Sequence, residues 1–344
     1  MAKFTTFRDV VESRSTKLTT KDPVDATEQF IKYDQSWPIN KEKDEQDKPT
    51  KKAKTDQSES SRLDSILQHL NTQHAFDTKK YISVPLLKKE EVTEDTRIYT
   101  FKHSLDSIDS FHLGIGQHIQ CAFATKDGDI IERPYAITRP TGADKDDGTI
   151  DILVKVAFPS EKDPGGTVSN IMDCLNAERG DEMLIRGPEG PISYLGDGKF
   201  TIQVGEQETK EVQAKKVNFI SGGTGMTPIY ATIRAILETD DEKSQIQVRF
   251  MDCNKDEKDV LLKEKLDELA KNHDRFEVIH VLEKPEKSWK GETGLIDKEK
   301  IERHLFKPEE GTISLVCGPP PMMKSSKEGL LELGFEDERT FFHY

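Results

Sequence analysis

The C-terminal part of the chain repeats one unit, an apolar run followed by an amphipathic helical stretch, and this rhythm limits the fold more than any other feature. From about Lys215 onward, "VNFIS" precedes a helical stretch, "IQVRFMD" precedes "DVLLKEKLDELAKN", "FEVIHVLE" follows, and "TISLVCG" precedes "PPMMKSSKEGLLELG". Such alternation indicates a parallel sheet with helices on both faces. Ligands of these sheets bind beyond the carboxyl ends of the strands.

One glycine-rich turn, "SGGTGMTP", falls at such a strand end. It places Gly223 and Gly225 at the first two positions of the G-x-G-x-x-G nucleotide fingerprint, but Pro228 stands at the third. Thr224 and Thr227 offer hydroxyl groups to a ligand. By spacing alone, the turn fits either a nucleotide-binding loop or a strand-to-helix connection without a ligand.

A second turn, "CGPPPM", follows the last predicted strand. Gly318 and the prolines force a sharp turn and leave Cys317 at the carboxyl end of that strand. A thiol there can contact a bound nicotinamide, or it can belong to the core. Cys121, Cys174 and Cys253 show no paired spacing, so we expect no zinc site, iron–sulfur cluster or disulfide framework, and no metal site at all.

Residues 81–212 contain short β-rich stretches and lack the alternation of apolar runs with amphipathic helical stretches that marks the C-terminal part. They read "YISVPLL", "TRIYTFKH", "QHIQCAFA", "TIDILVKVAF" and "EMLIRG", separated by turn signals such as "KDGD" and "KDDG". Strands at this density predict a closed antiparallel barrel. We expect one helix in this region, beginning near Val168.

Two motifs lie within the predicted barrel. In "ERPYAIT", Arg133 and Tyr135 are two apart on a strand and face the same way, so the guanidinium can grip a pyrophosphate and the phenol can lie against a flat cofactor. In "DPGGTVSNIM", two glycines precede a helix with Ser169 in its first turn, which suits a phosphate. The alternatives are an exposed Arg beside a packed Tyr, and an ordinary loop before a helix.

Residues 1–80 differ from the rest in composition. Residues 41–62 read "KEKDEQDKPTKKAKTDQSESSR", with almost no apolar side chain, so we expect a mostly disordered arm or linker. Residues 61–73, "SRLDSILQHLNTQ", can form one short amphipathic helix. The whole chain of 344 residues carries a formal charge of −14, which argues against nucleic acid as a partner. No signal peptide or transmembrane segment is expected, and we predict a cytoplasmic protein of unassigned oligomeric state.

With these motifs in this order, residues 81–344 closely resemble the cytochrome b5 reductase family of ferredoxin–NADP reductase-like flavoproteins. They also resemble the flavin end of eukaryotic nitrate reductases. Further family-like pieces are "FHLGIGQHIQ", "IRGPEGPISYLGDGKF", "CNKDEKDVLLKEKLDEL" and "ERTFFHY". The resemblance implies an FAD-binding barrel domain at 81–212 and a Rossmann-like NAD-binding domain at 213–344. It also implies hydride transfer from the nicotinamide to the flavin, then single-electron release to an acceptor.

The resemblance also implies roles for single residues. Tyr135, Thr224 and Cys317 are expected at the reacting centre. The residues expected to bind the cofactors are Arg133, Pro134, Tyr135, Lys155, Gly165, Gly166, Val168, Ser169, Gly223, Thr224, Gly225, Thr227, Asp259, Gly318, Pro319 and Met322.

Three positions depart from the family pattern. Ala136 stands where Ser or Thr bonds the flavin, and Thr138 is expected to lie too far along the strand to replace it. Ala157 replaces an aromatic near the adenine side, and Thr167 replaces a Lys near the phosphates. These changes are expected to alter rate and not cofactor identity.

The charged residues after the second predicted strand of the C-terminal part bear on the choice of nucleotide. Asp256, Glu257 and Asp259 would repel the 2′-phosphate of NADPH, so NADH is favoured, although Lys255 and Lys258 blunt the argument. The expected acceptor is a haem protein such as cytochrome b5. A faint echo of a cytochrome b5 domain in "DATEQF" (25–30) lacks both haem-binding histidines, so no haem is expected in this chain.

Other functions stay open. The chain can be a detached nitrate-reductase-like module, a quinone reductase or a ferric-chelate reductase. It can also be a flavoprotein scaffold without catalysis, for which Ala136 is the one favourable feature. The ending "FFHY" runs past the usual family end, and a frayed terminus is expected there, with Tyr344 folded over the flavin as the alternative.

Overall fold

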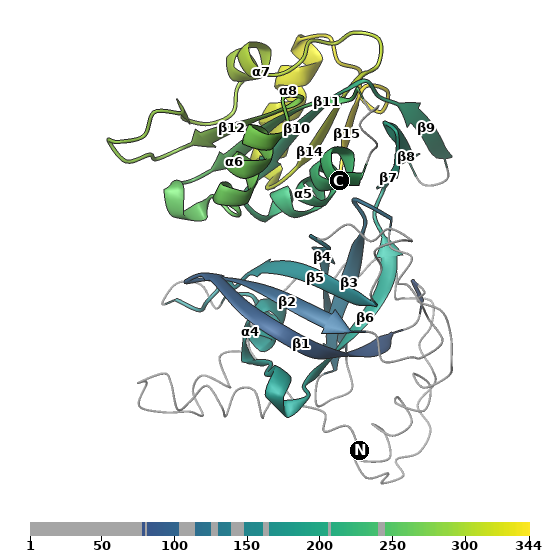
Figure 1. Ribbon diagram of the computed structural model, residues 1–344, viewed down its shortest axis with the longest axis vertical. Helices are drawn as coiled ribbons and strands as arrows, with labels where there is room; N and C mark the ends of the chain where they lie inside the picture. Colours follow the sequence, from purple (N-terminus) through teal and green to yellow (C-terminus); the bar gives the residue numbers. More distant parts are fainter. Residues whose placement is uncertain are drawn as a thin grey trace, which may run out of the picture. The chain divides into compact units, whose positions relative to one another are not determined.

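The computed structural model describes residues 78–79, 81–102, 114–124, 130–138, 148–160, 165–205, 208–239 and 245–344. The predicted disordered arm, the helix at 61–73 and the echo of a haem domain at 25–35 lie outside these residues. Two compact units are present (Figure 1). One comprises the described parts of Met1–Leu105, Gln120–Arg133 and Lys155–Arg186, and the other those of Asp106–Ile119, Pro134–Val154 and Gly187–Tyr344.

The first sheet is antiparallel and has six strands in the order β4-β3-β6-β1-β2-β5. Its strands are β1 (Ile82–Thr93), β2 (Thr96–Lys102), β3 (His118–Ala124), β4 (Ile130–Ala136), β5 (Thr149–Lys155) and β6 (Glu182–Glu189). The long strand β1 pairs antiparallel with both β2 and β6. Alternating residues such as Val84, Tyr99 and Phe101 are fully buried, as expected for a sheet with one face in a core.

The two edge strands of this sheet meet. Ile137, which follows β4, forms an antiparallel bridge with Ile152 of β5, and the Thr138 N–H donates to the Asp151 carbonyl at 2.9 Å. The Thr138 hydroxyl donates to the same carbonyl at 3.3 Å. The predicted closed antiparallel barrel is therefore confirmed, and the Thr138 hydroxyl serves the closure of the barrel.

The predicted helix of this region is α4 (Thr167–Cys174), followed by a short 3-10 turn η1 (Ala177–Arg179). A small antiparallel sheet, which the sequence analysis did not resolve, comes next in the order β7-β8-β9. Its strands are β7 (Ile192–Gly196), β8 (Lys199–Val204) and β9 (Glu208–Gln213).

The third sheet is parallel, with the strand order β13-β12-β11-β10-β14-β15. Its strands are β10 (Lys216–Gly222), β11 (Gln247–Asn254), β12 (Phe276–Leu282), β13 (Glu292–Thr293), β14 (Thr312–Cys317) and β15 (Phe341–His343). The connecting segments are η2 (Gly223–Gly225), α5 (Met226–Arg234), η3 (Ala235–Thr239), η4 (Glu257–Asp259), α6 (Lys263–Asn272), α7 (Lys298–His304) and α8 (Pro320–Glu332). The predicted strand–helix rhythm is confirmed.

The two faces of the parallel sheet have different coverings. One core cluster joins Ile220, Met251 and Val281 of the sheet to Ile301 of α7 and Leu330 of α8, so these helices cover that face. Since successive side chains of a strand point to opposite faces, the neighbouring residues at 221, 252 and 280 lie on the other face. Helix α6 lies on that second face, because Asp267 contacts His280 there.

The end of the chain is ordered into the sheet, so the expected frayed terminus is wrong. Strand β15 pairs with β14, and the Tyr344 N–H donates to the Val316 carbonyl at 3.1 Å. The Tyr344 phenol shares a hydrogen bond of 3.2 Å with the Thr232 hydroxyl of α5. Pairing with an existing sheet edge supplies the hydrogen bonds that a free terminus lacks. The position of Tyr344 over a flavin stays a prediction.

Candidate functional site

The motif residues Arg133, Pro134 and Tyr135 lie together on β4, where Arg133 is exposed and Tyr135 half-buried. Neighbouring Glu132 is held by Arg186, whose Nη2 lies 2.7 Å from Oε1 and whose Nε lies 2.9 Å from Oε2. These hydrogen bonds hold the pKa of Glu132 below its usual value. Because adjacent side chains of a strand alternate, Arg133 and Tyr135 share the face opposite this ion pair.

Lys155 ends β5 and is paired with a carboxylate. Its Nζ lies 3.3 Å from Asp95 Oδ2, and Asp95 also accepts hydrogen bonds of 3.0 Å from the Thr93 and Thr96 hydroxyls. Burial by itself would raise the pKa of Asp95, but these hydrogen bonds and the Lys155 charge outweigh it, so the pKa is lowered. The ammonium group of Lys155 therefore has a fixed place at the end of the strand.

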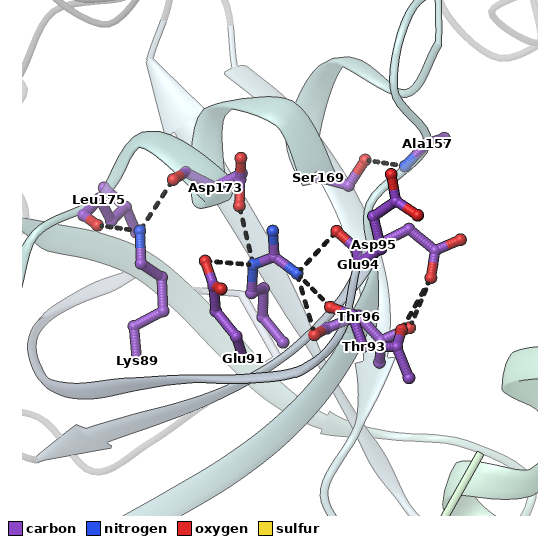
Figure 2. A network of polar contacts seen from close by, with 11 residues as sticks. Lys89, Glu91, Thr93, Glu94, Asp95, Thr96, Ala157, Ser169, Asp173 and Leu175 are labelled. Atoms are coloured by element: carbon purple, nitrogen blue, oxygen red, sulfur yellow. Dashed lines mark hydrogen bonds and ion pairs between the residues drawn. The ribbon is translucent and has the colours of Figure 1, made fainter. Parts of the chain in front are cut away.

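The glycines before α4 serve a close approach of two backbone segments. Gly165 has a φ of +78°, and a Cβ at this position would lie 2.2 Å from the Ala157 carbonyl oxygen. The Gly166 N–H donates to that same carbonyl at 2.9 Å. The Ser169 hydroxyl donates to the Gly166 carbonyl at 3.1 Å. It also accepts from the Ala157 N–H at 3.3 Å (Figure 2). Ser169 thus ties the helix to the chain after β5.

The N-terminus of α4 nevertheless fits a phosphate. It has no side-chain cap and no acidic residue in its first turn. Backbone N–H groups at such an end carry partial positive charge and bind anions. Val168, which was also predicted to bind the cofactor, is 2 % exposed and belongs to the core. The donor set of this segment is the kind that the phosphates of FAD require.

A polar network that the sequence analysis missed holds the other side of α4 (Figure 2). Arg97 Nη1 donates to the carbonyls of Thr93, Glu94 and Thr96 at 2.8–3.1 Å. Its Nε lies 3.2 Å from Asp173 Oδ1 in an ion pair. Lys89 Nζ donates to the carbonyls of Asp173 and Leu175 at 2.9 and 3.0 Å, at the helix C-terminus. Arg97 was not recognised because its partner, Asp173, lies far along the chain.

The first glycine-rich turn lies at the carboxyl end of β10, as expected. Gly223, Thr224 and Gly225 form η2, and the Thr227 hydroxyl donates to the Thr224 carbonyl at 2.9 Å. Gly223 has a φ of +54°, and a Cβ there would meet no atom within 4 Å. This open space at a positive φ is where a ligand can approach the backbone.

The second glycine-rich turn packs directly against the first. A Cβ on Gly225 would lie 2.3 Å from the Cys317 carbonyl oxygen and 2.8 Å from the Gly318 nitrogen. A Cβ on Gly318 would lie 2.7 Å from Met322 Cε. Pro319 is the N-cap residue of α8. The structure thus brings the two turns into contact. Gly225 and Gly318 allow this contact because a side chain at either position would clash with its neighbours.

Cys317 lies at the end of β14, where burial raises the pKa of its thiol to about 12. The thiolate is the reactive form of cysteine, so a thiol with this pKa is inert at neutral pH. We expect iodoacetamide at about pH 8 to leave Cys317 unmodified in the native protein and to alkylate it after unfolding in urea. Peptide mass spectrometry measures both, and rapid native alkylation would contradict the assignment.

Asp259 is the last residue of η4, beyond the carboxyl end of β11. Its N–H donates to the Asp256 carbonyl at 3.2 Å, and Asp256 itself lies 3.8 Å from Lys258 Nζ. Asp259 is half-buried, whereas Lys255 and Lys258 are exposed. An acidic residue therefore lies at the strand end where nucleotide specificity is decided in such sheets.

A second group of residues missed by sequence analysis crosses the parallel sheet. The Ser221 hydroxyl donates to Asp252 Oδ1 at 2.8 Å, and His280 Nδ1 lies 3.3 Å from Asp252 Oδ2. These residues come from three strands, and only the register of the sheet places them in a row. The isolated polar letters in "VRFMD" and "VIHV" were the available signal.

Two features are absent from the residues that the structure describes. In that part of the chain, no three His, Cys, Asp or Glu side chains are grouped so that they could hold a metal ion. None of the helices found there is both long enough and apolar enough to cross a membrane.

Comparison with known proteins agrees with the site. Residues 83–194 match the family model of the oxidoreductase FAD-binding domain, and residues 219–328 match that of the oxidoreductase NAD-binding domain. The chain is 36% identical over 267 residues to NADH-cytochrome b5 reductase 3 of Rattus norvegicus, covering 74% of this chain and 84% of that protein. It is 35% identical over 278 residues to NADH-cytochrome b5 reductase 1 of Homo sapiens, covering 76% and 85%.

A solved structure shows the same fold. The cytochrome b5 reductase domain of Ulva prolifera nitrate reductase matches with a TM-score of 0.70 and 32% identity, covering 79% of this chain and all of that one. The identity and the coverage are high enough to establish more than a shared fold. The chain belongs to the cytochrome b5 reductase family and is an oxidoreductase with an FAD-binding and an NAD-binding domain.

Proposed function

We propose that this protein takes hydride from NADH and passes the electrons one at a time to a haem protein such as cytochrome b5. The observation that carries the proposal is the contact of Gly225 in the first glycine-rich turn with Cys317 in the second, together with the open space at Gly223. Relatives of 35–36% identity are named NADH-cytochrome b5 reductases, which supports the same donor and acceptor.

The residues on the barrel side would hold FAD. Arg133 and the N-terminus of α4 would supply the positive charge and N–H groups that a pyrophosphate needs, and Gly165 and Gly166 would shape the turn that leads into this helix. Tyr135 offers a ring to lie against the flavin. When bound, FAD supplies the chemistry of accepting a hydride and releasing single electrons, and the protein supplies binding, orientation and exclusion of water.

The residues of the parallel sheet would bind the dinucleotide. Gly223, Thr224 and Gly225 would line the path of the nicotinamide and diphosphate. The un-ionised thiol of Cys317 would pack beside the reacting carbon without competing as a nucleophile. Asp259 would favour the free ribose of NADH over the phosphate of NADPH.

The decisive experiment is anaerobic reduction of the purified holoenzyme by NADH and, separately, by NADPH, followed by flavin absorbance. We expect NADH to bleach the flavin at least about tenfold more efficiently, a difference of about 1.4 kcal/mol, because the carboxylate repels the 2′-phosphate of NADPH. The variant Asp259→Asn should reduce the preference for NADH over NADPH. The variant Glu264→Gln, at an exposed position of α6, should leave that preference unchanged. Faster bleaching by NADPH would overturn the choice of nucleotide, and no bleaching by either would overturn the reductase.

The alternative of a detached nitrate-reductase-like module, with a different acceptor, has one observation in its favour. The structural match to the reductase domain of a nitrate reductase suggests a detached module of that kind. The reduced enzyme should be offered cytochrome b5, a ferric chelate and a quinone in parallel. Preference for cytochrome b5 supports the proposal, and preference for either of the others replaces it.

A further inference from the structure

A row of polar side chains crosses the parallel sheet on the face opposite α7 and α8. The strand register pairs Ser221 of β10 with Asp252 of β11, and Asp252 with His280 of β12. On its other side, Ser221 pairs with Cys317 of β14. Ser221 and Asp252 have no exposed surface, and the His280 side chain is 8% exposed.

Asp252 is the centre of this row. Its Oδ1 accepts from the Ser221 hydroxyl at 2.8 Å, and its Oδ2 accepts from Asn254 Nδ2 at 2.9 Å. His280 Nδ1 lies 3.3 Å from the same Oδ2. The carboxylate stands between the hydroxyl and the imidazole, so His280 cannot take a proton from Ser221 as the base of a hydrolytic triad does. The row is therefore suited to holding the Ser221 side chain in position and not to hydrolysis.

The contacts of His280 fix its charge. Its second nitrogen, Nε2, lies 3.1 Å from Asp267 Oδ1 of α6. Ionised carboxylates only accept hydrogen bonds, so both ring nitrogens must donate, and the ring that satisfies both contacts is the imidazolium. Burial by itself would lower the pKa of His280, but the hydrogen bonds and charges of Asp252 and Asp267 outweigh it and raise the pKa.

The other charged groups around His280 have partners or point to solvent. On α6, Lys263 Nζ lies 2.5 Å from Asp267 Oδ2, while Glu264, Lys265, Glu268 and Lys271 are exposed. On β13, Glu292 lies opposite Val281 and is paired with Arg303 and His304. Asp252 and Asp267 are thus the groups whose charge His280 balances.

The row ends next to the nucleotide turn. Ser221 immediately precedes Gly222, the N-cap residue of η2. When His280 loses its proton, one ring nitrogen presents a lone pair to a carboxylate, and Asp252 is left buried without a cation. The carboxylate is then held by neutral donors alone, the Ser221 hydroxyl, the Asn254 amide and one imidazole N–H, so its position and that of the Ser221 hydroxyl are fixed less firmly.

We propose that His280 is a positioning residue for nicotinamide-nucleotide binding: through Asp252 it holds Ser221, and with it the start of the Gly222–Gly225 turn. Nucleotide binding is then strong while His280 is protonated and weakens as the pH rises through the pKa of the folded protein. This inference rests on the proposed function, in which that turn binds the dinucleotide.

The test is a pH series on the oxidised holoenzyme, from about pH 5.5 to about pH 9, which brackets a histidine of raised pKa. Calorimetry measures the Kd of NAD⁺, so no turnover is needed, and NMR follows the His280 ring, assigned with the variant His280→Gln. We expect the Kd to rise several-fold, about threefold or more, with the same midpoint as the His280 titration. A Kd that stays flat while His280 titrates would overturn the proposal.

Asp267→Asn supplies a variant that should fold, because this side chain is 45% exposed. Removing its charge should move the His280 midpoint and the Kd midpoint down together by about 0.5–1 pH unit. Glu264→Gln removes one charge from the same helix without touching His280, and both midpoints should stay in place. A His280 midpoint that moves while the Kd midpoint does not would overturn the coupling.

Ser221→Ala tests the last link. The His280 titration should persist in this variant, while the pH dependence of the Kd disappears, because the hydroxyl that carries the effect is gone. A pH response as large as that of the wild type would overturn the role of Ser221. Failure of the proposed function has a different signature, the absence of NAD⁺ binding at every pH, and it would remove this inference with it.

Discussion

Replacing Arg97 with alanine is expected to lower the free energy of unfolding by about 3–5 kcal/mol, since removing one partner of a buried ion pair leaves the other uncompensated. The Arg97 side chain is 8% exposed, and that of Asp173 is 17% exposed. The substitution also removes the donor of the carbonyls of Thr93, Glu94 and Thr96. Urea denaturation of the purified protein measures the loss.

The same substitution should release FAD. Asp173 is in the last turn of α4, and its contact with Arg97 fixes the helix whose N-terminus is proposed to hold the phosphates. We therefore expect a lower flavin content, read from absorbance, under conditions in which the protein is still folded. Glu91→Ala is the matched control, because Glu91 is 76% exposed and lies 3.7 Å from the same guanidinium. It should change stability by less than about 0.5 kcal/mol. Equal effects of the two variants would contradict the role of Arg97.

Gly225→Ala is expected to separate the two glycine-rich turns. The new Cβ would lie 2.3 Å from the Cys317 carbonyl oxygen and 2.6 Å from its carbon, and backbone atoms cannot turn aside as a side chain can. Forcing a methyl group into such a space typically costs about 1–3 kcal/mol. Because the displaced segment is the proposed nucleotide site, we expect the Kd of NAD⁺ to rise by about tenfold or more, measured by calorimetry.

Gly222→Ala is the matched control for this variant. Its Cβ would meet Met322 Sδ at 2.6 Å and Pro319 Cδ at 2.9 Å, and the methionine side chain is flexible. Neither glycine needs a positive φ, since φ is −134° at Gly222 and −60° at Gly225. We expect a smaller loss of affinity at Gly222, and trimming the side chain in Gly222→Ala/Met322→Ala should restore part of it. If Gly225→Ala binds as well as the wild type, the packing of the turns does not matter for binding.

Local patterns were sufficient to predict the two kinds of sheet. The apolar runs at "VNFIS" and "TISLVCG" became β10 and β14, and the helix expected near Val168 is α4 (Thr167–Cys174). Each of these elements has a signal within its own sequence, either a period or a turn residue. The identity of the cofactors came from the family resemblance, because hydrophobic periodicity does not indicate which cofactor a fold binds.

Features that depend on distant partners were not predicted. Strand β15 exists because β14 offers an unpaired edge, and nothing within "FFHY" says so. Arg97 has a partner 76 positions away, at Asp173, and the row from Ser221 to His280 exists only in the register of three strands. The sequence analysis explained Gly225 by the approach of a ligand. The structure shows that a glycine is required there because the Cys317 backbone leaves no room for a Cβ. The individual roles of the predicted site residues stay predictions.

The closure of the barrel has a consequence for where the barrel opens locally. In the described residues, the end of β4 is joined to β5 by the bridge between Ile137 and Ile152 and by the Thr138 bonds to Asp151, whereas β1 and β2 are paired from Leu86 to Thr93. Local opening is easiest where the fewest hydrogen bonds must break. The barrel therefore has a seam, and the strand beside it carries Arg133 and Tyr135. We therefore expect local opening of the barrel to begin at this seam, next to the strand that is proposed to contact the flavin.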